Sequence, residues 1–151
     1  MKYQFLLVSL FGAQLALLSP VVAQNASVVT KQYDDGGVYE GTFKNGLQHG
    51  TGTYRLPNGY EYTGTWTNGE ILGEGVANFP NGSVYEGSFA KGKPEGQGNI
   101  TFADGGTYSG SWADGKITGS GIATYANGSI YEGAFRNATM MHGVSKGTFI
   151  N

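Results

Sequence analysis

A repeat of 23 residues constrains this chain more than any other feature of its sequence. The phrase VYEGTFKNG at residues 38–46 returns as VYEGSFAKG at 84–92 and as IYEGAFRNA at 130–138. The period is marked, without insertion, by Tyr39, Tyr62, Tyr85, Tyr108 and Tyr131. Such regularity indicates a stack of small units that bury their apolar faces against one another.

Within a unit the side chains alternate between two faces, as they do in β-strands. Two residues after each of these tyrosines comes a glycine, and four residues after the same tyrosine comes a second aromatic residue. Turn pairs such as Asn45-Gly46 and Asn58-Gly59 then separate the alternating segments, and Asn-Gly suits tight hairpin turns. Each unit is therefore predicted to be a β-hairpin. The glycines are Gly41, Gly64, Gly87, Gly110 and Gly133.

The predicted fold is all-β: a single-layer, elongated, twisted antiparallel sheet of tandem 23-residue hairpins. Such a sheet has no second layer, so a ring from one strand must cover the bare backbone of a neighbouring glycine. The composition agrees, because 27 glycines disfavour helices and 10 tyrosines with 8 phenylalanines disfavour disorder.

The ends of the chain depart from the repeat. Residues 1–23 have a charged start, an apolar run and a small-residue end, which predicts a helical signal peptide cleaved after Ala23. An uncleaved anchor helix is the alternative. Residues 24–32 are predicted to be a short linker, and 33–151 the repeat array. The array comprises a half unit at 33–38, full units at 39–61, 62–84, 85–107 and 108–130, and a degenerate terminal unit at 131–151.

The composition argues against several classes of function. The chain lacks cysteine and has only two histidines, which excludes thiolate metal sites and disfavours a histidine-built one. No Gly-x-Ser-x-Gly motif occurs, and Glu40, Glu86 and Glu132 fall on the polar face. We therefore expect no catalytic residues, no metal and no cofactor. A net charge of −2 without a basic run gives no support for nucleic-acid binding.

The aromatic row is the candidate binding surface, and its glycines are structural. Its residues are expected to form the core, with rings on glycines. If the row is only half buried, it also offers an apolar strip that docks a partner. The row consists of Tyr39, Phe43, Tyr62, Trp66, Tyr85, Phe89, Tyr108, Trp112, Tyr131 and Phe135.

The pattern Tyr-x-Gly-x-Phe/Trp-x-Asn-Gly, followed by Gly-x-Gly and Asn/Asp-Gly, resembles the MORN repeat (membrane occupation and recognition nexus). The resemblance covers essentially all of the chain after residue 23. It implies an elongated sheet of hairpins that serves as a scaffold, a dimerisation surface or a protein-binding module, and some members are proposed to contact phospholipids. The family is usually intracellular, and the predicted signal peptide departs from that setting.

These observations lead to the hypothesis of an exported, non-enzymatic scaffold in the periplasm or outside the cell, either free or associated with the envelope membrane. An envelope glycan- or choline-binding module and a lipid-contacting repeat protein remain as alternatives. The terminal unit has Ala138 in place of the turn glycine and carries Met140-Met141. It is expected to form a homodimer through its edge, or else to close the sheet as a cap in a monomer.

Overall fold

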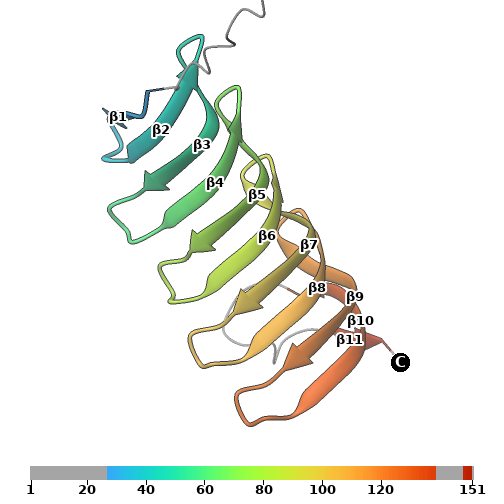
Figure 1. Ribbon diagram of the computed structural model, residues 1–151. Coiled ribbons are helices and arrows are strands. Elements are labelled where there is room, and N and C mark those ends of the chain that lie inside the picture. The colour runs from blue at the N-terminus through green and yellow to red at the C-terminus, as the bar shows by residue number, and fades with distance from the viewer. Residues whose placement is uncertain (1–26, 139–147, 151) are drawn as a thin grey trace, which may run out of the picture.

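The computed structural model describes residues 27–138 and 148–150 of the chain. These residues form one antiparallel sheet of eleven strands, in which each strand pairs with its neighbours in the sequence (Figure 1). Among them, no helix is long and apolar enough to cross a membrane. The strands are β1 (Val29–Gln32), β2 (Val38–Lys44), β3 (Leu47–Arg55), β4 (Glu61–Thr67), β5 (Glu70–Asn78), β6 (Val84–Ala90), β7 (Lys93–Thr101), β8 (Thr107–Ala113), β9 (Lys116–Thr124), β10 (Ile130–Ala138) and β11 (Thr148–Ile150).

The predicted all-β sheet of tandem hairpins is confirmed, with one correction at its start. Residues 29–32, which the sequence places in a linker, form β1 and pair with β2 from Val29 opposite Gly41 to Gln32 opposite Val38. The open edge of β2 offers backbone donors and acceptors to any extended neighbour, so β1 joins without the repeat signature. The predicted signal-peptide helix lies outside the described residues.

Two kinds of turn alternate along the sheet. The first is a two-residue turn with both residues at positive φ, such as Asn45 at 52° and Gly46 at 79°. The second has three residues, unlike the tight pair predicted: Leu56 N donates to Tyr60 O at 2.9 Å, and only Gly59 has positive φ. The Asn58 Oδ1 atom accepts a hydrogen bond from Tyr60 N at 2.9 Å, which holds this turn.

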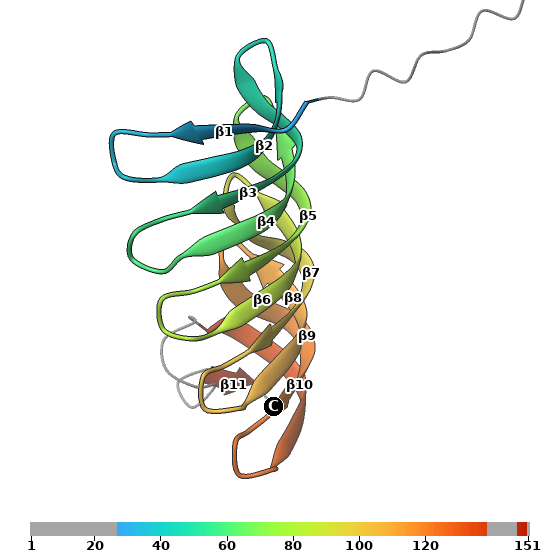
Figure 2. The ribbon, with the colours of Figure 1, turned by 60° about the vertical axis from the view of Figure 1, so that its left-hand side comes forward.

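A row of paired glycines crosses the sheet. Gly41 lies opposite Gly52, which lies opposite Gly64 on its other side, and the same pairing continues from strand to strand. The strands bend strongly, and both series of turns lie on the same side of the bend (Figure 2). The full row is Gly41, Gly52, Gly64, Gly75, Gly87, Gly98, Gly110, Gly121 and Gly133.

The tyrosine rings occupy the space that these glycines leave. A side chain added at Gly87 would meet the Gln97 carbonyl oxygen and the Gly98 Cα at 2.6 Å, and the Tyr85 hydroxyl at 2.8 Å. Tyr85 itself is fully buried, and its hydroxyl donates to Ser88 O at 3.0 Å. The predicted stacking of rings on glycine backbone is therefore observed.

A bulge follows each glycine pair in the hairpins. Gly41 faces Gly52 but Phe43 faces Gln48, so β3 contains two residues more than β2 between these pairs. Gly50 lies in the extra segment at a φ of 83°, a conformation that suits glycine. The bulge shifts the register between the tyrosine row and the second aromatic row in every full unit.

We predict that Gly87→Val is far more destabilising than Glu86→Ala. The valine would collide with backbone atoms of β7, which should cost at least about 3 kcal/mol. Glu86 is exposed on the opposite face, where a truncation should stay within about 0.5 kcal/mol. Urea unfolding of the two variants measures the difference. Equal losses of stability would show that the two faces are assigned wrongly.

Burial also changes the ionisation of the tyrosines. Burial raises the pKa of Tyr62 to about 12, and the Tyr62 hydroxyl donates to Thr65 O at 3.1 Å. Burial raises the pKa of Tyr39, Tyr85 and Tyr108 as well. In the unfolded chain a tyrosine ionises near pH 10, so above that pH the unfolded state binds fewer protons than the folded state.

We therefore predict that the contribution of the tyrosines to the free energy of unfolding is constant below about pH 10, and that stability falls between about pH 10 and 12. Denaturant unfolding at a series of pH values measures this dependence. Tyr62→Phe removes one hydroxyl that resists ionisation, so it should reduce the slope above pH 10. A slope equal to that of the unchanged protein would contradict this assignment.

Candidate binding surface

The ten predicted aromatic residues form one unbroken series of ring-edge contacts. Within a unit the tyrosine meets the second aromatic residue, as for Tyr85 and Phe89 at 5.0 Å between ring centroids with planes at 90°. Between units the tyrosine meets the ring of the next hairpin, as for Tyr85 and Trp112 at 5.0 Å. Edge-to-face geometry is the preferred arrangement for such rings. In order, the rings are Phe43, Tyr39, Trp66, Tyr62, Phe89, Tyr85, Trp112, Tyr108, Phe135 and Tyr131.

This series is the core of the protein. Eight of the ten side chains are buried, and only Phe43 and Tyr131, in the first and last units of the series, are partly exposed. The polar atoms are paired inside the fold: Trp66 Nε1 donates to Gly52 O at 3.3 Å and Trp112 Nε1 to Gly98 O at 3.1 Å. The rings therefore have little surface left for a ligand, except where the array opens beside them.

Such an opening lies across the first three full units. It is a hollow of about 440 Å³, a size typical of ligand pockets. Trp66 and Phe89 of the aromatic series line it together with residues from both kinds of turn. The lining, which contains no charged side chain, is Tyr54, Leu56, Asn58, Tyr60, Trp66, Ile71, Phe79, Pro80, Phe89, Gly92 and Pro94.

Three rings outside the predicted series give the hollow its aromatic walls. Tyr54, Tyr60 and Phe79 are each partly exposed, and the rings of Tyr60 and Phe79 lie 5.8 Å apart. Tyr54 faces inward by the alternation of its strand, so the sequence contained a signal for it. Tyr60 has no such signal, because Ser83, Gly106 and Ser129 occupy its position in the next units. It is a departure from the repeat.

The hollow is electrically neutral at physiological pH. Burial raises the pKa of Tyr60. Burial, followed by the nearby Asp35 carboxylate, raises the pKa of Tyr54, whose hydroxyl donates to Asp35 Oδ2 at 3.2 Å. Both hydroxyls therefore remain protonated. The arrangement suits a ligand whose buried part is uncharged and apolar, and the Asp35 carboxylate of the protein lies at the rim of the hollow.

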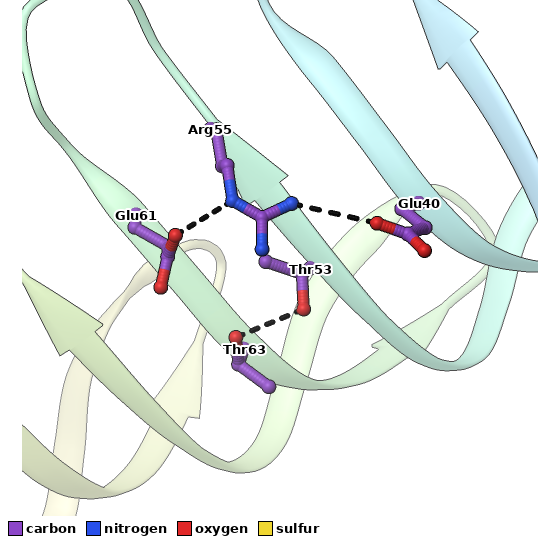
Figure 3. A network of polar contacts seen from close by, with 5 residues as sticks. All are labelled: Glu40, Thr53, Arg55, Glu61 and Thr63. Atoms are coloured by element: carbon purple, nitrogen blue, oxygen red, sulfur yellow. Dashed lines mark hydrogen bonds and ion pairs between the residues drawn. The ribbon is translucent and has the colours of Figure 1, made fainter.

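The opposite face of the sheet is polar. Arg55 lies between two carboxylates, with Nε at 2.7 Å from Glu61 Oε2 and NH1 at 3.6 Å from Glu40 Oε2, beside a hydrogen bond between Thr53 and Thr63 (Figure 3). These groups are solvent-accessible, and such ion pairs contribute little stability.

The three glutamates of the repeat, Glu40, Glu86 and Glu132, are exposed as predicted. Within residues 27–138 and 148–150, no group of three or more histidine, aspartate or glutamate side chains is arranged to hold a metal ion. The polar face therefore offers solvated carboxylates and no metal-binding group in the described part of the chain.

Comparison with known families agrees with the architecture. The MORN repeat matches residues 39–59, 62–84, 85–107 and 108–130, which together make up more than half of the chain. No curated protein matches the chain. MORN repeats generally mediate interactions with other proteins or with membranes. The four matches coincide with the hairpins described above, and the chain belongs to the MORN-repeat family.

Proposed function

We propose that this protein is an exported, non-enzymatic scaffold that binds a segment of another protein in the apolar hollow. The observation that carries the proposal is the hollow itself, an open and uncharged site of about 440 Å³ beside an aromatic series in which eight of the ten rings are buried. Exposed apolar concavities on an otherwise polar surface mark interaction sites.

The site is rigid enough to bind without large rearrangement. Trp66 and Phe89 are buried and held by ring-edge contacts to Tyr62, and Trp66 also donates to Gly52 O. A preformed site loses little conformational entropy on binding, so the apolar contact is retained as affinity.

A second candidate is an envelope glycan- or choline-binding module, with the protein periplasmic or extracellular in either case. The clustering of Tyr54, Tyr60 and Phe79 from adjacent units favours it, because aromatic walls stack on sugars and surround quaternary ammonium groups. Lipid contact is a weaker third candidate, and liposome flotation tests it. We also propose that any homodimer forms through the C-terminal edge of the sheet.

Export is tested by the mass of the protein recovered after expression in its native host. Cleavage after Ala23 predicts an intact mass that lacks residues 1–23. A mass that still includes them would contradict cleavage and favour a membrane anchor.

Scaffold function is tested by affinity capture from the native envelope, with the protein lacking residues 1–23 as bait. We expect one abundant protein partner, which should be lost with Tyr60→Ser because the hollow loses a wall. That variant carries the residue found at the same repeat position, Ser83, so it should fold. Ser129→Ala, at this position in a distant unit, is the matched control. Enrichment of wall glycan without a protein would support the second candidate and oppose the scaffold.

A further inference from the structure

We propose that the hollow binds a proline-rich segment carrying a basic residue at the end nearest the turn between β1 and β2. This inference rests on the proposed function, because it names the chemistry of the partner segment that the hollow accepts. It follows from three properties of the hollow: its walls, its hydrogen-bonding groups and the charge at its rim.

The walls suit proline rings. Tyr54, Tyr60 and Phe79 present partly exposed rings, and Pro80 and Pro94 add flat apolar surface. Aromatic-lined grooves accept extended proline-rich segments, whose polyproline conformation is largely preformed and so costs little entropy to bind. The hollow has no charged lining residue, which excludes an ion pair within it.

The hydrogen-bonding groups of the hollow discriminate against an ordinary peptide. Five of its backbone carbonyls already accept bonds within the protein. Three of them are Leu56 O, from Gly59 N at 3.1 Å, Tyr60 O, from Leu56 N at 2.9 Å, and Phe79 O, from Gly82 N at 2.9 Å. On the opposite wall, Ile71 O and Pro94 O accept bonds at 3.2 and 3.0 Å from turn glycines.

An ordinary peptide would therefore bring backbone N–H donors to a surface on which these five carbonyls each accept a bond already. Each donor buried without a partner loses about 1–3 kcal/mol, whereas proline has no N–H to bury. The free donors of the hollow fit a proline-rich segment, because the Tyr60 hydroxyl and the Asn58 side-chain NH₂ can donate to its carbonyls. Asn58 Oδ1 is already an acceptor for Tyr60 N.

The rim gives the segment its orientation. Asp35 lies beyond Tyr54 and accepts its hydroxyl hydrogen bond at 3.2 Å, and Asp34 is exposed beside it. No basic side chain lines the hollow. A lysine or arginine at this end of the segment would meet two carboxylates, so the basic residue selects one of the two directions in which a polyproline helix can lie.

The test uses the fluorescence of Trp66 in a Trp112→Phe background, which leaves a single tryptophan in the chain. Phenylalanine is found at this repeat position in Phe43, Phe89 and Phe135, so the change suits the fold. The probes are hexaproline peptides with arginine at the amino end, at the carboxyl end or absent, and a matched peptide with alanine in place of proline.

We expect a saturable fluorescence change with hexaproline, tighter binding for one placement of the arginine, and binding at least about tenfold weaker for the alanine peptide. Tyr60→Ser should weaken hexaproline binding at least about tenfold, while Ser129→Ala leaves it unchanged. Asp34→Asn should reduce the preference between the two arginine placements, as should added salt.

The proposal is overturned if hexaproline gives no saturable signal up to about 1 mM, or if the alanine peptide binds equally well. It is also overturned if the folded Tyr60→Ser variant, verified by circular dichroism, binds as the parent does. A protein partner captured from the envelope but not displaced by hexaproline would leave the scaffold function standing and refute the proline-rich ligand. The two failures are thus distinguishable.

Discussion

The rest of the structure depends on the contact between a tyrosine ring and two glycines paired across neighbouring strands. Tyr85 covers Gly87 of its own strand and Gly98 of the next, at distances that leave no room for a side chain on either. The ring thereby removes bare backbone from water without a second layer of structure. Its hydroxyl would be costly to bury alone, and the Ser88 carbonyl accepts it at 3.0 Å. Each tyrosine ring also packs against the edge of a ring from the next hairpin. A single hairpin cannot make this contact alone, so stability requires several copies of the same unit in the sequence.

Because most aromatic rings are needed for this packing, few of them are available to form a binding site. Residues of the repeat form the core, and the hollow opens beside two of its rings, Trp66 and Phe89, where Tyr60 departs from the repeat. Tyr60 takes a position that Ser83 and Ser129 occupy in other units, and Tyr54 takes one filled by Ala77 in the next unit. The fold therefore supplies a rigid frame, and a few substitutions on that frame supply a site. The walls of the hollow are uncharged, and five of its backbone carbonyls already accept a hydrogen bond. Such a site disfavours ligands that would bury a charge or an unpaired N–H group.

Much of the fold could be predicted from the sequence, because alternation and turn chemistry are local properties. The spacing of Tyr39, Gly41 and Phe43 sufficed to predict a hairpin and the stacking of rings on glycine. The start of the array could not be predicted, because β1 is held by backbone pairing and lacks the repeat residues. The hollow was missed for another reason. It depends on the bend of the sheet, which brings Tyr60 and Phe79 near Ile71 and Pro94, residues separated along each hairpin.

The two ends of the sheet differ in ways that give the array a direction. At the start, β1 has only four residues, all exposed, and Lys31 lies over the Tyr33 ring at 4.9 Å. A short edge strand with a charge on its aromatic side resists pairing with another chain. At the other end, β11 pairs with Ala134 to Arg136 of β10. The proposed ligand site spans β3 to β7 and has its acidic rim at the turn between β1 and β2. An edge at the far end can then carry the proposed dimer contact without competing for the hollow.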